Sequence, residues 1–265
     1  MLIAFLLLSA SILSVWVNKK PQIWGSLLLL SVIAGMWIGS ISWIGLGILA
    51  LLTLFWVWYT HKPNALLFLL LIAFTLSLKL QLLPGFTSIF ITPKFKIGFP
   101  MAVVGLLPLA LVVPLSRSKE DWIKALKGFL WGLIGIGIMA LLATAAKATH
   151  WQLKLPSFLG VRAWSNLVLT SIPEEAFYRG FMQAKLCSYF KNRKGGDFFA
   201  LILTSILFTL AHLYWSPNLM ILIFVFVASL LYGGVYLYSR KIESAILTHF
   251  CLNLIHMIFF NYHGL

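Results

Sequence analysis

Charged residues are scarce in this chain of 265 residues: 10% are Asp, Glu, Lys or Arg, whereas 61% are apolar. An average soluble domain is about a quarter charged. A mean hydropathy of +0.98 over the whole chain leaves too little polar surface to cover a globule in water. The composition therefore excludes a soluble domain and indicates a protein that lies within a lipid bilayer.

Cysteine is also rare, and Cys187 and Cys251 lack the C-x-x-C spacing of a metal or redox site. The sequence has no H-E-x-x-H motif, so it does not indicate the zincin type of metalloprotease. No period of about 20–50 residues recurs along the chain. These absences exclude a disulfide framework and a repeat architecture.

What the sequence contains instead is a series of apolar runs separated by short breaks. A membrane-spanning helix needs about 20 mostly apolar residues. The sequence therefore predicts an all-α fold, a polytopic transmembrane helix bundle with about 8–10 spans. The candidate runs are residues 2–17, 22–39, 41–60, 64–83, 100–116, 124–146, 163–189, 198–214, 218–238 and 242–262. The pairs Gly35-x-x-x-Gly39 and Gly128-x-x-x-Gly132 favour close helix packing inside the protein.

Basic residues outnumber acidic ones by 20 to 6, which gives a formal charge of +14. They lie in the breaks between apolar runs, where basic residues fix orientation and bind anionic headgroups, so we predict a bilayer and no nucleic acid as the partner. We expect a multi-pass integral membrane protein of a bacterial inner (cell) membrane, with the more basic set of loops in the cytoplasm.

Ionisable residues inside apolar runs carry the strongest functional signal, because each costs roughly 2.5–3.5 kcal/mol at the centre of a spanning helix. Solvent or helix-end electrostatics accounts for four of the six acidic residues. These four are Glu120, Asp121, Asp197 and Glu243. The other two, Glu174 and Glu175, lie halfway along the run 163–189.

Local spacing distinguishes the two glutamates. Glu175 and Arg179 are four residues apart and can pair on one helix face. Glu174 points about 100° away and has no partner in the local sequence. Pro173 lacks a backbone N–H and disfavours helical geometry before it, so we expect the helix to kink or restart there, with its N–H groups directed at the carboxylates.

Two more polar motifs follow on the next apolar runs, Phe208-x-x-x-His212 and His249-x-x-x-Asn253. At a rise of about 1.5 Å per residue, we expect these motifs and Glu174 to lie near mid-depth of the bilayer. A carboxylate in low-dielectric surroundings can take a proton from water and return it to a leaving group. Imidazole and amide N–H groups can stabilise an oxyanion. The set therefore favours hydrolysis of an amide bond inside the membrane.

The ordered motifs E-E-x-x-x-R, F-x-x-x-H and H-x-x-x-N resemble those of the CPBP family of intramembrane proteases, which includes CAAX prenyl endopeptidases and bacteriocin-processing enzymes. The resemblance implies that Glu174 is the general base, that His212 fixes the attacked water, and that His249 and Asn253 form the oxyanion pocket. Glu175, Arg179 and Phe208 would be supporting or substrate-binding residues.

The resemblance covers about residues 160–262, which we expect to form a CPBP-type protease domain. Residues 1–150 are expected to form an added N-terminal transmembrane bundle of unknown role. The predicted activity is that of an intramembrane endopeptidase acting on a membrane-associated or lipid-anchored peptide or protein.

We favour a glutamic mechanism that requires no cofactor and no metal, because a base with imidazole and amide donors is sufficient. Zinc is the alternative cofactor, since two histidines and a glutamate could leave one coordination position open. Two other functions stay open. One is a proton-coupled transporter with Glu174, Glu175 and His212 as a relay, although inverted repeats are absent. The other is a non-catalytic membrane protein that binds a partner.

Overall fold

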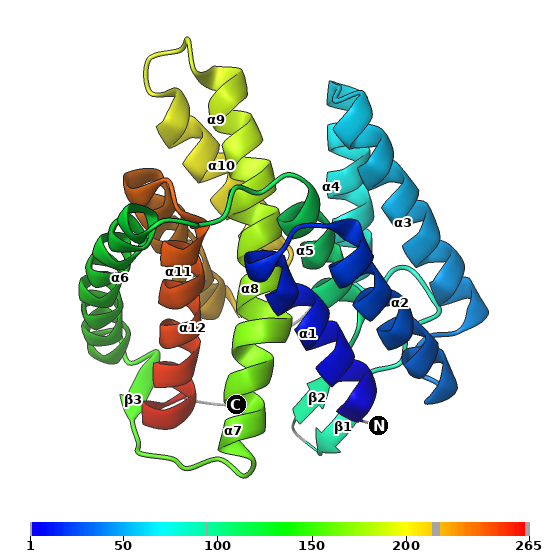
Figure 1. Cartoon of the computed structure of the whole chain (residues 1–265). Coiled ribbons are helices and arrows are strands. Elements are labelled where there is room, and N and C mark those ends of the chain that lie inside the picture. Colours follow the sequence, from blue (N-terminus) through cyan, green and yellow to red (C-terminus); the bar gives the residue numbers. More distant parts are fainter. Residues whose placement is uncertain (1, 94, 214–217, 263–265) are drawn as a thin grey trace. The chain divides into compact units, whose positions relative to one another are not determined.

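The computed structural model describes residues 2–93, 95–213 and 218–262 (Figure 1). Helices dominate the described residues, and the predicted all-α bundle is confirmed. The described strands form two short antiparallel pairs. These are β1 (Ile89–Thr92) with β2 (Phe95–Ile97), and β3 (Thr149–Trp151) with β4 (Phe260–Tyr262).

Within the described residues, four helices are long and apolar enough to cross a membrane, and with the composition they make the chain an integral membrane protein. These are α3 (Trp43–His61), α6 (Lys119–Ala145), α11 (Leu219–Ser239) and α12 (Ile242–Phe259). Shorter apolar helices occupy other predicted runs. They are α1 (Leu2–Val17), α2 (Pro21–Trp37), α4 (Ala65–Lys79), α5 (Pro100–Leu111) and α10 (Gly196–Leu210). The predicted end of the run 198–214, Tyr214, lies outside the described residues.

The run predicted at 163–189 contains five consecutive helical segments. They are α7 (Leu159–Trp164), a π-helix (Ser165–Ser171), α8 (Ile172–Glu175), a second π-helix (Ala176–Gln183) and α9 (Ala184–Phe190). Of the kink or restart expected at Pro173, the restart is wrong, because Ser171 and Ala176 on either side of α8 both have right-handed helical dihedral angles. The flanking π-helical turns shift the hydrogen-bond acceptors, which lets the chain absorb the missing N–H of Pro173 without a break.

By contacts the chain divides into two compact units. The first unit contains Met1–Val113 and Val168–Gly180, and the second contains Pro114–Leu167 and Phe181–Leu265. Each unit therefore combines segments that are distant in the sequence, and α8 belongs to the first unit together with the N-terminal helices.

Helix α5 forms the core of the first unit. Its residues Ala102 to Ala110 are all buried, and it packs against α1, α3, α4 and α8. A helix that is apolar on every face is stable only where neighbours surround it, which explains the central position of this Val- and Leu-rich segment. Gly35 packs in the same unit, since a Cβ there would lie 2.9 Å from the side chains of Ile41 and Phe99.

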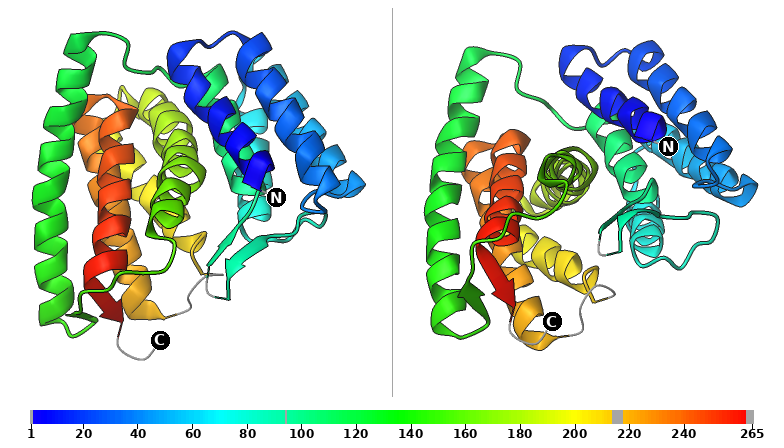
Figure 2. Two further views of the ribbon diagram at one scale, coloured as in Figure 1. Left: turned by 60° about the horizontal axis from the view of Figure 1, so that its bottom comes forward. Right: turned by 90° about the horizontal axis from the view of Figure 1, so that it is seen from below.

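In the second unit α6 lies along α11 and α12, which in turn pack against each other (Figure 2). Small residues on α6 permit this approach. A Cβ added at Gly132 would lie 2.2 Å from Thr248 Oγ1, and one at Gly128 would lie 2.9 Å from Ser239 Cβ. The prediction that Gly128 and Gly132 serve internal packing is confirmed.

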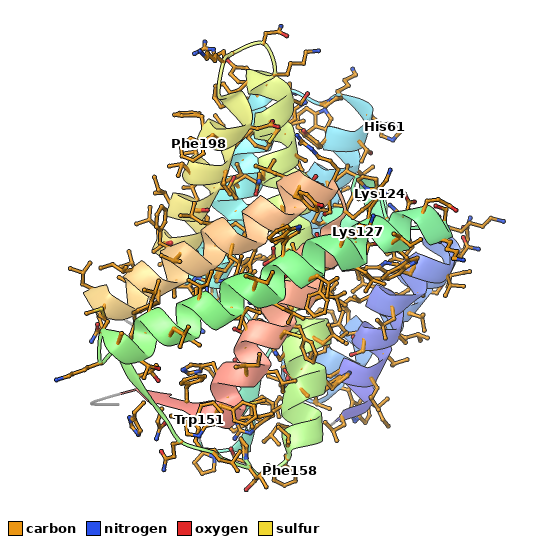
Figure 3. The ribbon with its side chains drawn as sticks, turned by 90° about the vertical axis from the view of Figure 1, so that its left-hand side faces the viewer. His61, Lys124, Lys127, Trp151, Phe158 and Phe198 are labelled. Carbon is orange, nitrogen blue, oxygen red and sulfur yellow. The ribbon has the colours of Figure 1, made fainter. Side chains whose placement is uncertain are left out.

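The basic loops of the second unit meet at one end of it. Lys241 pairs with Asp121 at the start of α6, and Arg240 donates a hydrogen bond to Asp197 at the start of α10. Figure 3 shows Lys124 and Lys127 on α6 toward this end and Trp151 near the other end of the same helix. This clustering within the unit is what the positive-inside pattern requires.

Glu243, at the start of α12, also lies at this end but is buried, with 3% of its surface exposed. Its carboxylate accepts hydrogen bonds of 2.8 Å from the backbone N–H and the hydroxyl of Ser116. Of the two explanations expected for Glu243, solvent is therefore wrong, whereas its place in the first turn of α12 agrees with the helix-end explanation. Donors from a distant segment, the backbone N–H and the hydroxyl of Ser116, also stabilise this charge.

Candidate active site

Glu174 lies on α8 in the first unit, and its side chain is 8% exposed. Its Oε1 atom accepts a hydrogen bond of 2.6 Å from Nζ of Lys79, the last residue of α4. The local sequence offered Glu174 no partner, and the structure supplies one from 95 residues away. A buried charge is tolerated when it is paired in this way.

Glu175 and Arg179 form the ion pair that their spacing predicts, with Arg179 Nε 3.2 Å from Glu175 Oε2. Both side chains are inaccessible to solvent. The ring of Tyr178, also fully buried, has the guanidinium carbon of Arg179 5.8 Å from its centroid, within the range of a cation–π interaction. The pair is thus part of the interior of the first unit.

Helix α8 is held in place by its close approach to α5. A Cβ added at Gly105 would lie 2.1 Å from Pro173 Cα and 2.4 Å from its carbonyl oxygen. Only glycine allows the two backbones to come this near. Because Pro173 directly precedes Glu174, this contact fixes the part of the backbone that carries the carboxylate.

In the second unit, two aromatic side chains from two neighbouring helices contact His249. The imidazole of His249 on α12 stacks on Tyr232 of α11, with ring centroids 4.5 Å apart. Phe208 of α10 meets the His249 ring edge to face at 6.2 Å. His249 is 4% exposed, so its orientation is set by packing and not by solvent.

His212 joins the same group through Phe208, whose ring centroid lies 4.5 Å from that of the imidazole. Helix α10 ends at Leu210, so His212 lies in the turn that follows it and not in the helix. Its Nδ1 atom is 2.7 Å from the carbonyl oxygen of Phe208. Since a carbonyl can only accept, Nδ1 carries the hydrogen, and in the neutral ring Nε2 then presents its lone pair.

Asn253 on α12 is oriented by another asparagine. Its Nδ2 donates to Asn166 Oδ1 at 2.9 Å, and Asn166 Nδ2 donates to the carbonyl oxygen of Phe250 at 3.1 Å. Asn166 lies in the π-helix before α8 and belongs to the second unit. This chain of hydrogen bonds determines which way the Asn253 amide points.

The predicted site residues thus lie in two groups, one in each unit. The first unit holds Glu174, Glu175 and Arg179; the second holds Phe208, His212 and His249, with Asn253 one turn beyond His249. Sequence reasoning missed the neighbours Lys79, Asn166 and Tyr232. A polar residue inside an apolar run was the available signal for Lys79 and Asn166.

A metal site is not formed within the described part of the chain: no three His, Cys, Asp or Glu side chains are grouped so as to hold an ion. The chemistry that the two groups supply is that of a paired carboxylate, two oriented imidazoles and an oriented amide.

No curated protein and no solved structure matches the chain. Residues 156–255 match the family model described as type II CAAX prenyl endopeptidase Rce1-like. The matched segment contains all three motifs, from Glu174 to Asn253. The resemblance that the motifs predicted is therefore confirmed: over residues 156–255 the chain is similar to the type II CAAX prenyl endopeptidase Rce1-like family.

Proposed function

We propose that this protein is an intramembrane endopeptidase that hydrolyses a peptide bond of a membrane-associated or lipid-anchored substrate. The observation that carries the proposal is the complete motif set inside the segment that matches the Rce1-like family. The oriented imidazoles of the second unit, of which His249 is buried, support it, because catalytic groups must be held by packing to act in one geometry.

In the proposed mechanism Glu174 is the general base. Its carboxylate takes a proton from a water molecule, and the oxygen of that water attacks the carbonyl carbon of the scissile peptide bond. Collapse of the tetrahedral intermediate breaks the C–N bond, and Glu174 returns the proton to the leaving amine. The products are a new carboxylic acid, which keeps the second proton of the water, and a new amine, so the reaction consumes one water molecule and needs no other reactant.

His212 is proposed to hold the attacking water. Its Nδ1–H donates to the carbonyl of Phe208, so Nε2 is an acceptor for a water hydrogen. His249 and Asn253 are proposed to donate hydrogen bonds to the oxyanion of the tetrahedral intermediate. The ring stack on His249 and the bond from Asn253 to Asn166 support these roles, because both fix a donor before substrate arrives.

We propose that the reaction is of the glutamic type and needs no metal, since the base and the oxyanion donors are all side chains. The Glu175–Arg179 pair supports α8 from inside the first unit. Location in a bacterial inner membrane stays a prediction from the sequence.

The test uses the purified full chain in lipid nanodiscs with a fluorogenic farnesylated CAAX-type peptide and its unprenylated counterpart. These probes follow from the description of the matched family. If neither is cut, a comparison of membrane proteomes with and without the protein should reveal a shortened peptide to use instead. We expect Glu174→Gln to lose at least about 10²-fold in kcat, as loss of a general base does.

Glu120→Gln is the matched control, since Glu120 is an exposed acid on α6. Cleavage by Glu174→Gln at the wild-type rate would refute the role of Glu174. Loss of activity on chelation, with recovery on adding zinc, would refute the metal-free mechanism but not the peptidase activity.

A further inference from the structure

The ion pair between Lys79 and Glu174 connects the N-terminal helices to the proposed general base. The two side chains are 10% and 8% exposed, and the 2.6 Å distance from Nζ to Oε1 is that of a short, charge-assisted hydrogen bond. Both residues belong to the first unit, and the fold alone brings them together across 95 positions of sequence.

Lys79 also balances the charge of its surroundings. Its Nζ lies 5.7 Å from the centroid of the Tyr178 ring, which Arg179 approaches at 5.8 Å. The buried group thus contains two carboxylates, those of Glu174 and Glu175, and two cations. The formal charge of these four side chains is zero, and removal of the Lys79 ammonium would change it to −1 in a buried region.

The short length of α4 explains why the Lys79 ammonium lies inside the protein. Its 15 residues span about 22 Å at 1.5 Å per residue, less than the roughly 30 Å of a hydrocarbon core. Lys79 is the last residue of the helix, and Leu78 just before it is buried. A lysine at the end of a helix too short to cross the core can lie within it, facing an acid partner.

A buried carboxylate without a counter-charge takes up a proton, and a protonated carboxyl group cannot accept one from water. A general base inside the membrane therefore needs a neighbour that favours its ionised form. The same hydrogen bond restricts rotation of the carboxylate. A base held in the reactive orientation lowers the activation barrier more than a base that rotates freely.

We propose that Lys79 is a positioning residue that keeps the Glu174 carboxylate ionised and oriented for proton abstraction. The N-terminal helices thereby complete the protease site instead of merely being attached to it. This inference rests on the proposed function, because it assigns Lys79 its role through Glu174.

The experiment compares three variants in nanodiscs on the peptide that the wild type cleaves. Lys79→Met removes the charge at similar length, Lys79→Arg keeps it, and Lys62→Met changes an exposed lysine just after α3 in the same unit. We expect kcat of Lys79→Met to fall about 10- to 100-fold with KM within about 3-fold, because the loss concerns the base and not substrate binding. Lys79→Arg should recover most of kcat, and Lys62→Met should match the wild type.

A wild-type kcat in Lys79→Met would overturn the proposal. A Lys79→Arg variant as slow as Lys79→Met would also overturn it. If the positive charge of Lys79 is what keeps Glu174 ionised, the positive charge of arginine should serve the same purpose. If Lys79→Met is not recovered from membranes, Lys79→Gln is measured in its place. We expect the same loss of kcat, and an unchanged kcat in Lys79→Gln would likewise overturn the proposal.

Glu174→Gln distinguishes a failure of the role of Lys79 from a failure of the proposed function. If Glu174→Gln is inactive and Lys79→Met is fully active, the role of Lys79 fails while the proposed function stands. If Glu174→Gln itself cleaves at the wild-type rate, the proposed function fails first.

Discussion

The imidazole ring of His249 lies nearly parallel to the phenol ring of Tyr232, with centroids 4.5 Å apart and an angle of 11° between the planes. The two residues come from adjacent helices, α12 and α11, and Tyr232 is 2% exposed. Aromatic stacking is worth about 0.5–1.5 kcal/mol beyond area burial. The stack therefore determines the plane in which His249 can donate a hydrogen bond.

Loss of this stack should slow catalysis. We expect Tyr232→Leu to lower kcat about 2- to 10-fold, which corresponds to the stacking free energy. Tyr232→Phe keeps the ring and should stay within about 2-fold of wild type. Steady-state kinetics on the cleaved peptide makes the comparison. Equal losses in both variants would show that the hydroxyl matters and not the stack.

Asn166 should act through Asn253. Removal of an oxyanion donor costs about 10²–10³ in kcat, which is the loss we expect for Asn253→Ala. Asn166→Ala frees the Asn253 amide to rotate and should cost roughly 10-fold. The double variant should be no slower than Asn253→Ala, because the two residues act as one. Asn192→Ala, in an exposed loop of the same unit, is the control. A double variant whose loss of kcat equals the product of the two single losses would contradict the coupling.

The backbone contact between Gly105 and Pro173 predicts a stability effect. Gly105→Ala should destabilise the protein by about 1–3 kcal/mol, because the new methyl group would have to displace backbone atoms. Gly47→Ala, on α3 with open space around its Cβ, should be neutral or stabilise by about 0.5–1 kcal/mol. Thermal unfolding in detergent measures both. A Gly105→Ala protein as stable as Gly47→Ala would show that α5 and α8 are not held together as described.

The buried carboxylate of Glu243 predicts a second stability effect. Glu243→Ala leaves the backbone N–H of Ser116 buried without its acceptor, which should cost about 1–3 kcal/mol. Glu120→Ala removes an exposed acid near the same end of the unit and should change stability by less than about 0.5 kcal/mol. The difference in melting temperature between the two variants tests the assignment. Equal melting temperatures would show that the carboxylate of Glu243 is solvated and not buried against Ser116.

A pH dependence follows from the pair of Asp197, in the first turn of α10, and Arg240, directly after α11. The hydrogen bond from Arg240 holds the pKa of Asp197 below its ordinary value. A carboxyl group with a lowered folded pKa stabilises the protein above its unfolded pKa of about 4 and loses that effect as the pH falls. Because both side chains are about half exposed, the gain stays below about 1 kcal/mol.

Melting temperatures of wild type and Asp197→Asn should therefore differ slightly at pH 7 and converge as the pH falls through the lowered pKa of Asp197. High salt at pH 7 should reduce the difference as well. A difference that persists in acid would assign the stabilisation to packing of the side chain and not to its charge.

Local patterns in the sequence predicted local structure well. The apolar runs gave the helices, and the four-residue spacing of Glu175 and Arg179 gave their ion pair. Gly35, Gly128 and Gly132 were predicted correctly as packing positions. The prediction was wrong for Gly39, which has open space around it and a φ of +74° just after α2 ends.

Partners from distant segments could not be found in the same way. Lys79 meets Glu174 across 95 residues, Asn166 meets Asn253 across 87 and Ser116 meets Glu243 across 127. Each pairing depends on how helices associate, which hydropathy does not encode. The unbroken helix at Pro173 was missed for a different reason: the π-helical turns that accommodate it have no simple sequence signal.

The packing of α6 against α11 and α12 has a consequence for biosynthesis. A ribosome adds about 5–20 residues per second, so α6 leaves it roughly 5–20 s before α11 is complete. During that interval the glycine face of α6 has neither of these partners. The most apolar part of α6 has a mean hydropathy of 2.0, so this helix is apolar enough to be stable in the bilayer without these partners. The helices of the second unit can pack together only when translation is nearly finished.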